Sequence, residues 1–132
     1  IFARRTCEGG DLIAVFGCAG ERDTSKRSPM GRIANKYCST IILTEEDPRR
    51  EGNQAIFSDL RFLMDNPSCR VWEIESRREA IRKAVSIAQS GDTLLFLGKG
   101  HEKTIERMDE KISWDEVEEV REALRLAQEK QP

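Results

Sequence analysis

The sequence has few of the residues that mark metal-binding and disulfide-rich proteins. Its 132 residues include one histidine and four cysteines, Cys7, Cys18, Cys38 and Cys69, with no Cys-x-x-Cys pair. This irregular spacing argues against a structural zinc site and against a disulfide framework. We therefore expect Cys18 and Cys38 to be small buried hydrophobic residues, as in proteins of a reducing compartment, and we place the chain in the cytoplasm.

An excess of one charge and a long apolar stretch are also missing. Lys and Arg number 22 against 24 Asp and Glu, so the formal net charge of −2 gives no overall basic field for nucleic acid or an anionic membrane. The apolar run at residues 94–97 is far shorter than the roughly 20 residues of a membrane-spanning helix. We expect one globular domain over residues 1–132, with no nucleic-acid and no membrane partner. Because the chain starts without Met or a signal-peptide pattern, we also expect it to be a piece of a longer protein.

Short apolar runs predict the strands. Residues 12–16 and 93–97 are continuous apolar runs, which suit strands buried in a parallel sheet. Residues 40–44 are short and β-branched, and residues 71–74 alternate like a half-buried strand.

Amphipathic stretches between these runs predict helices. Ser28 is expected to cap the first helix, and residues 53–64 and 78–90 are expected to form the next two. Ser113 and Glu116 have the spacing of a capping box, which predicts the start of a final helix. The apolar faces of the first and final helices are expected to be Met30, Ile33, Ala34 and Tyr37, and Val117, Val120 and Leu124, respectively.

The order of these elements predicts the fold class. Residues 105–112 are typical of a hairpin, with its turn at Asp109 and Glu110. Elsewhere strands and helices alternate, which predicts an α/β domain with a Rossmann-like, doubly wound, mostly parallel sheet and helices on both faces. Ligands of such sheets bind at the carboxyl ends of the strands.

A loop with small residues and basic side chains follows the first predicted strand. Gly17 and Gly20 allow close approach of the backbone, while Arg22, Lys26 and Arg27 supply donors for an anion ahead of a helix. A phosphate or a carboxylate would suit this loop. A solvated loop with internal ion pairs is an equally good interpretation of the same residues.

The second predicted strand ends in a charged turn. Pro48 stiffens a segment in which Glu46 and Asp47 supply acceptors and Arg49 supplies a guanidinium. Such a turn can bind an amino acid, which carries both charges. The alternative is a cluster of surface ion pairs, which the residues taken alone favour.

A glycine-rich segment follows the strand at residues 93–97. It is not a Walker A loop, because Thr93 and Gly100 stand where that motif needs Gly and Ser or Thr. The glycines let the backbone pass close to a ligand, with His101 and Glu102 as polar contacts. A lone histidine is more often structural than catalytic. The chain therefore has no evident motif for ATP chemistry of its own.

In their order along the chain, these motifs resemble the C-terminal domain of the Mur ligases, specifically the branch that adds the third residue of the peptidoglycan stem. Residues 15–23 match the family's Val-Phe-Gly-x-Gly-Gly-Asp-Arg-Asp, with Ala19 and Glu21 as substitutions. Residues 26–31 and 76–81 match two further family segments, and residues 98–102 carry the Gly-Lys-Gly-His-Glu signature intact. The resemblance covers nearly the whole chain.

The resemblance implies an activity for the full-length protein. N-terminal UDP-binding and central ATPase domains, absent here, would bind the nucleotide substrate, ATP and Mg²⁺, and would convert the D-glutamate carboxylate of UDP-N-acetylmuramoyl-dipeptide to an acyl phosphate. The C-terminal domain would hold the diamino acid so that its amine attacks this acyl phosphate, and would contain no catalytic residue and no metal site itself. We expect this fragment alone to be inactive.

The resemblance also assigns site residues. Arg22 would bind the carboxylate of the substrate, the turn of Glu46, Asp47 and Arg49 would hold the amino acid, and Gly98 and Glu102 would contact its far end. Weaker candidates for lining the closed cleft are Lys26, Arg27, Arg77, Lys99 and His101.

One departure from the family pattern concerns specificity. Diaminopimelate-adding members have Asp-Asn-Pro-Arg where this chain has Glu46, Asp47, Pro48 and Arg49. The negative charge of Asp47 is expected to weaken carboxylate binding and to favour an ammonium. Both meso-diaminopimelate and L-lysine stay open as substrates.

Two alternative functions are weighed against this one. A folylpolyglutamate or cyanophycin synthetase belongs to the same superfamily, but the intact Gly-Lys-Gly-His-Glu and the Pro-Arg turn favour the cell-wall branch. A non-catalytic anion-binding α/β module would explain neither the missing start Met nor the missing ATP motif.

Overall fold

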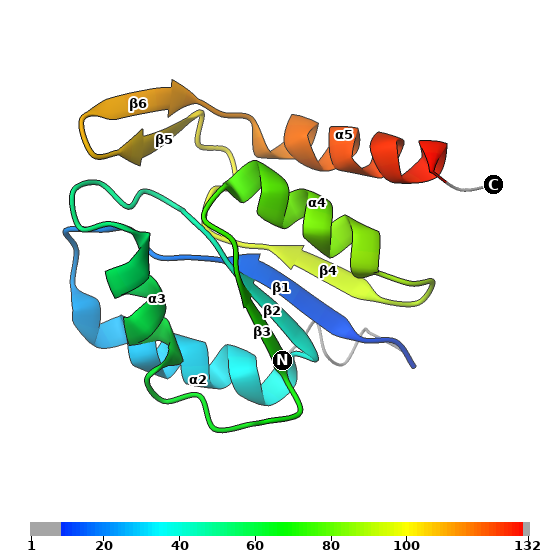
Figure 1. The fold of residues 1–132 in the computed structure, drawn as a ribbon, viewed down its shortest axis with the longest axis horizontal. Coiled ribbons are helices and arrows are strands. Elements are labelled where there is room, and N and C mark those ends of the chain that lie inside the picture. The colour runs from blue at the N-terminus through cyan, green and yellow to red at the C-terminus, as the bar shows by residue number, and fades with distance from the viewer. Residues whose placement is uncertain (1–8, 131–132) are drawn as a thin grey trace.

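A computed structural model describes residues 9–130 as one parallel sheet with helices on both faces and a separate hairpin (Figure 1). The four-stranded sheet has the order β3-β2-β1-β4, with all pairs parallel. In chain order the elements are β1 (Leu12–Phe16), η1 (Thr24–Lys26), α2 (Arg27–Tyr37), β2 (Thr40–Leu43), α3 (Asn53–Arg61), β3 (Arg70–Glu73), α4 (Arg77–Ile87), β4 (Thr93–Phe96), β5 (Thr104–Arg107), β6 (Glu110–Ser113) and α5 (Glu116–Glu129). The doubly wound α/β architecture is confirmed.

Alternating side chains of the central strands build a core on each face of the sheet. Leu12, Ala14 and Phe16 of β1 pack with α2 and α3, while Ile13 and Val15 face α4. Every residue of β1 and β2 is buried, which is why these strands are continuous apolar runs. The fold is therefore set by two apolar layers that share one sheet.

A third apolar cluster attaches the hairpin and α5 to the rest of the domain. Ile105 and Trp114 pack with Ala123 of α5 and with Ile81 and Val85 of α4. The hairpin and the start of α5 thus lie beside the N-terminal end of α4 (Figure 1). Among the described residues, no helix is both long and apolar enough to cross a membrane.

The predicted starts of the first and final helices are wrong. Helix α2 begins at Arg27, after η1, so Ser28 lies inside the helix. Helix α5 is capped by Asp115, which accepts a hydrogen bond from the Glu118 amide, and Ser113 is the last residue of β6. The hairpin turn lies one residue earlier than expected, at Met108 and Asp109.

The expected apolar helix faces are also partly wrong. Val117 and Leu124 are 49% and 46% exposed, and α5 instead packs through Val120, Ala123 and Ala127. On α2, Met30 and Ile33 are exposed. Gly31 of α2 lies against α3, and Ala123 of α5 packs in the cluster with α4, because small residues let these helices approach each other closely.

Cys18 and Cys69 are free thiols. Cys38 and Cys69 are buried and Cys18 is half-buried beside the core. Burial raises the pKa of the Cys18 thiol to about 11, so it is protonated near neutral pH. Cys7 lies outside the described residues.

Candidate functional site

The three motif loops meet at the carboxyl ends of β2, β1 and β4, which are consecutive strands of the sheet. The Gly20 amide donates to the Asp47 carbonyl at 2.7 Å, which joins the first loop to the charged turn. Lys99 Nζ lies 2.9 Å from Asp47 Oδ1, which joins the glycine-rich loop to the same turn. The expected meeting of the motifs at this edge is confirmed.

Two glycines allow this close approach. A Cβ atom at Gly20 would lie 1.9 Å from the Pro48 carbonyl oxygen, so only glycine fits against the turn. Gly98 has a φ of +106°, and a Cβ there would lie 3.0 Å from the carboxyl carbon of Glu46. The backbone of the glycine-rich loop therefore passes directly beside the Glu46 side chain.

Three carboxylates surround one buried ammonium in this edge of the sheet. The Lys99 side chain is 0% exposed, and its Nζ lies 2.7 Å from Glu102 Oε2 as well as 2.9 Å from Asp47 Oδ1. Asp47 Oδ1 also accepts a hydrogen bond from the Glu106 amide at 2.9 Å. With Glu46 included, the group has three potential negative charges and one positive charge, which favours a cationic ligand.

The pKa of Glu46 is shifted by its surroundings. Burial raises the pKa of Glu46 to about 6, and the negative charges of Asp47 and Glu102 act in the same direction. The positive charges of Lys99 and Arg77 oppose this rise. Glu46 therefore changes charge close to neutral pH.

Arg49 is held in place by the hairpin and by the first loop. Its Nε donates to Glu106 Oε2 at 2.7 Å, and its Nη1 donates to the Gly20 carbonyl at 2.8 Å. Its backbone has a φ of +52°, and its amide donates to the Glu106 carbonyl at 3.0 Å. The whole Arg49 side chain is 19% exposed.

A groove of about 550 Å³ opens beside these residues, between α2 and the strands β1 and β4. Glu46, Gly98, Arg22 and Lys26 lie on its polar side, and apolar side chains line the remainder. Arg22 and Lys26 are exposed. The groove thus brings together residues from all three predicted motifs, with acidic and basic groups on its walls.

Three of the weaker site candidates are buried in this structure, and one of them, Arg27, still contributes to the lining of the groove. Arg27 is 1% exposed and donates to Glu51, to Asp59 and to the Ala19 carbonyl. Its hydrogen bonds hold the pKa of Glu51 at about 2. Arg77 and Lys99 are 0% and 1% exposed. Each cation is buried because carboxylates from distant segments neutralise it.

Of the two other weaker candidates, Lys26 lines the groove and His101 is exposed in the turn after Gly100. The hairpin contributes residues that sequence reasoning missed. Glu106 binds Arg49, and Arg107 makes two hydrogen bonds of 2.8 Å to the carboxylate of Glu45, which is itself 3% exposed. These pairs join residues 57 and 62 positions apart, so no local pattern could have indicated them.

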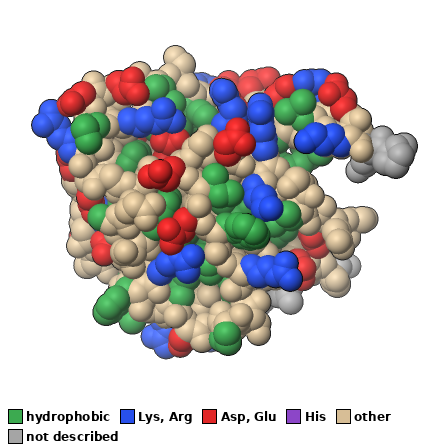
Figure 2. Space-filling view, in the orientation of Figure 1, with side chains coloured by type: hydrophobic (Ala, Val, Ile, Leu, Met, Phe, Trp, Pro, Cys, Tyr) green, Lys and Arg blue, Asp and Glu red, His purple; other side chains and the backbone are tan. Residues whose placement is uncertain are grey.

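The outer surface near the hairpin and α5 carries both charges. Figure 2 shows Lys and Arg side chains interspersed with Asp and Glu side chains along this edge. Within residues 9–130, no group of three or more His, Cys, Asp or Glu side chains is arranged to hold a metal ion. The described residues therefore do not fit a resident metal site.

Comparison with known proteins relates this geometry to one family. The model of the family described as Mur ligase, glutamate ligase domain, matches residues 2–100. A UDP-N-acetylmuramyl-tripeptide synthetase of Roseiflexus sp. is 44% identical over 119 residues, covering 87% of this chain and 23% of that protein. A UDP-N-acetylmuramoyl-L-alanyl-D-glutamate–2,6-diaminopimelate ligase of Caldanaerobacter subterraneus is 43% identical over 122 residues, covering 92% of this chain and 25% of that protein.

A solved structure gives the same result. The structure of a UDP-N-acetylmuramoyl-L-alanyl-D-glutamate–2,6-diaminopimelate ligase superimposes with a TM-score of 0.86 at 36% identity, over 96% of this chain and 27% of that chain. This chain thus spans about a quarter of the length of the relatives it matches. Because the family model covers most of the chain and the fold agrees with that of a solved member, the chain belongs to the Mur ligase family.

Proposed function

We propose that this chain is the amino-acid-binding part of an ATP-dependent ligase that joins a diamino acid to UDP-N-acetylmuramoyl-L-alanyl-D-glutamate. The observation that carries the proposal is the meeting of the charged turn and the glycine-rich loop, where Glu46 lies against Gly98 and Asp47 binds Lys99. The names of the relatives agree with this activity, since they are tripeptide synthetases and 2,6-diaminopimelate ligases.

The charged side chains at this edge of the sheet fit the two charges of an amino acid, with Glu46 and Arg22 on the groove and Arg49 and Glu102 outside its lining. Glu46 and Glu102 would bind an ammonium group, while Arg22 and Arg49 would bind a carboxylate. Asp47 presents less negative charge to a ligand than its sequence context predicts, because the Lys99 ammonium pairs with its carboxylate and the Glu106 amide donates a hydrogen bond to it. The substrate class is therefore a diamino acid, bound at its charged ends.

The proposed role of these residues is to orient an amine. Mur ligases are ATP-dependent ligases that generally need Mg²⁺. ATP with Mg²⁺ would activate the substrate carboxylate as an acyl phosphate. The amine nitrogen then forms a bond to the carbonyl carbon, the bond from that carbon to the phosphate oxygen breaks, and inorganic phosphate leaves while the nitrogen loses a proton. Holding the amine in line with the carbonyl removes much of the entropic cost of this step.

The test uses the full-length natural protein. We expect phosphate release from ATP, with Mg²⁺ and UDP-N-acetylmuramoyl-L-alanyl-D-glutamate present, to depend on one diamino acid of a panel that includes meso-diaminopimelate and L-lysine. Release that depends instead on glutamate with a folate or peptide acceptor would assign the chain to another branch of the superfamily. A folded protein that responds to no amino acid would contradict the proposal.

A second prediction concerns the pH dependence of amino-acid use. Glu46 binds an ammonium only when ionised, and its pKa is raised to about 6, so acidification below pH 6 is expected to lower kcat/KM for the amino acid. Glu46→Gln is expected to lower kcat/KM at pH 8 about 10-fold and to flatten this acid limb. Glu79→Gln, at an exposed position of α4, is the control. An acid limb unchanged in Glu46→Gln would show that another group titrates.

A further inference from the structure

The buried guanidinium of Arg77 contacts both the charged turn and the glycine-rich loop of the proposed amino-acid site. Arg77, the first residue of α4, is 0% exposed. Its Nη1 donates to the Glu45 carbonyl at 3.0 Å, and its Nη2 donates to the Leu97 carbonyl at 2.8 Å. These two carbonyls belong to the residues immediately before Glu46 and Gly98. Arg77 therefore bonds to the backbone where the charged turn begins and where the glycine-rich loop begins.

Within the sheet, the ends of β2 and β4 are linked only indirectly, through β1. Strands β2 and β4 are not neighbours, because β1 lies between them in the order β3-β2-β1-β4. No hydrogen bond of the parallel ladders joins β2 to β4 directly. The planar fork of Arg77 spans the end of β1 and bonds to both backbone segments, in addition to the bond between Lys99 and Asp47.

The guanidinium is itself fixed by charged partners. Glu116, the first residue of α5, accepts from Arg77 Nε at 2.9 Å and from Nη2 at 2.6 Å, and it also accepts from Trp114 Nε1 at 2.9 Å. The Arg77 amide donates to Glu45 Oε2 at 3.1 Å. Hydrogen bonds to charged groups in a water-excluded environment are strong and directional. Arg77 is thereby held in one position.

We propose that Arg77 is a positioning residue, which sets the separation between the Glu46 turn and the Gly98 loop and so the fit of the amino acid. Because Arg77 has no exposed surface, it acts through these backbone segments and does not touch the substrate. The inference rests on the proposed function, since it concerns the same site. Two residues outside the sequence motifs hold Arg77 in place. Glu116 of α5 binds it directly, and Trp114 binds Glu116.

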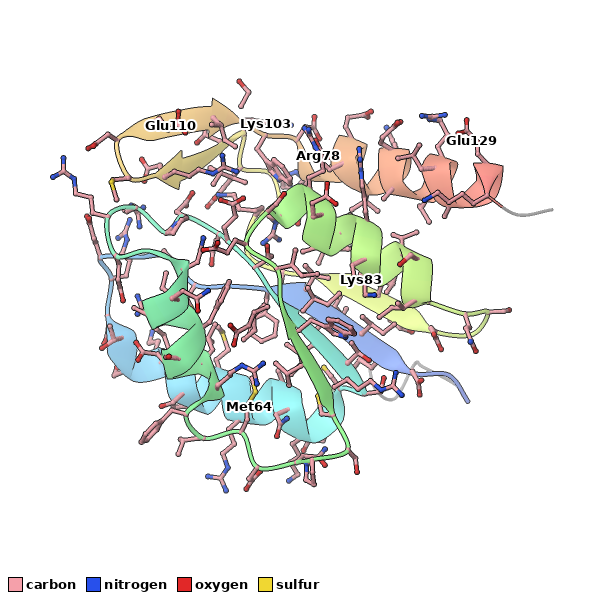
Figure 3. All side chains as sticks on the ribbon, viewed as in Figure 1. Met64, Arg78, Lys83, Lys103, Glu110 and Glu129 are labelled. Carbon is pink, nitrogen blue, oxygen red and sulfur yellow. The ribbon has the colours of Figure 1, made fainter. Side chains whose placement is uncertain are left out.

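The primary test compares Arg77→Lys with Arg78→Lys in the full-length natural ligase. Lysine keeps the charge but cannot reach two carbonyls and a carboxylate with a planar fork. We expect Arg77→Lys to raise the KM for the amino acid at least 10-fold and to leave the KM for ATP within twofold. Arg78 binds Glu119 of the same helix α5 from an exposed position, between α4 and the start of α5 in Figure 3, so Arg78→Lys should leave both KM values within twofold.

A second pair of variants separates positioning from stability. Glu116→Gln removes the charge of the buried partner of Arg77, and Glu119→Gln removes the charge of the half-buried partner of the exposed Arg78. Only Glu116→Gln is expected to raise the KM for the amino acid, when assayed well below its melting temperature. If Arg77→Lys and Glu116→Gln lower the melting temperature but leave the KM for the amino acid unchanged, Arg77 is a purely structural residue and the proposal is overturned.

The remaining outcomes are also decisive. If neither variant folds, Trp114→Phe provides the test. It removes one hydrogen bond to Glu116 and leaves the Arg77–Glu116 ion pair in place, and we expect it to raise the KM for the amino acid about threefold. An unchanged KM for the amino acid in Trp114→Phe overturns the proposal. A wild-type ligase without amino-acid-dependent phosphate release contradicts the proposed function. An active wild type with an insensitive Arg77→Lys contradicts only the role of Arg77.

Discussion

Replacing Arg49 by alanine is expected to raise the KM for the amino acid about 100-fold and to leave the KM for ATP within twofold, because truncating one partner of a charged pair at a binding site costs about 2–5 kcal/mol. The variant removes the positive charge beside the groove and the hydrogen bonds of Arg49 to Glu106 and to the Gly20 carbonyl. Steady-state kinetics of the full-length ligase, with each substrate varied in turn, measures both constants.

Arg50→Ala is the matched control for this prediction. Arg50 is the next residue, carries the same charge and pairs with Asp109, but its side chain is 72% exposed. Its removal is therefore expected to change both KM values less than twofold. Equal increases in the KM for ATP and for the amino acid in Arg49→Ala would contradict the assignment of this turn to the amino acid.

Gly31→Ala is expected to reduce the free energy of unfolding by at least about 3 kcal/mol, because overpacking against backbone requires the helices to move apart. Gly31 lies inside α2, where alanine normally favours a helix by about 1 kcal/mol over glycine. Here, however, a Cβ atom would lie 1.8 Å from the Leu60 carbonyl oxygen of α3. The contact between the two helices thus reverses the sign that helix propensity predicts.

Urea unfolding of the chain, followed by circular dichroism, measures this effect. Arg32→Ala is the control, since Arg32 is the next residue of the same helix and is exposed. We expect this control to change stability by no more than about 0.5 kcal/mol. A Gly31→Ala chain that is as stable as the wild type would mean that α2 and α3 do not pack as closely as described.

The sheet and the place of the site could be predicted from local pattern. β1 and β2 are buried on both faces, so their sequences are continuous apolar runs of the kind that parallel strands require. The polar motifs after these strands and after β4 must then meet, because parallel strands that are close in the sheet end at the same edge. The meeting of Glu46 with Gly98 follows from this rule.

The helix ends were less predictable because several residues can act as caps. Ser113 has capping spacing, yet Asp115 caps α5 because the chain is still paired in β6 at Ser113. Likewise, the apolar residues Val117 and Leu124 fit a helical stripe, but Ala123 makes the contact because small residues allow close packing with α4. Local spacing cannot decide between such alternatives.

By itself the sequence determined the fold class, the parallel strands and the edge where the motifs gather, since these depend on the spacing of apolar residues along the chain. Only the tertiary structure decided which charges bind each other and which stay free for a ligand. Lys99 is buried because Asp47, 52 positions away, neutralises it, and Arg77 is buried because Glu116, 39 positions away, does the same. The cost of burying a charge depends on its partners in space, and the fold alone brings those partners together.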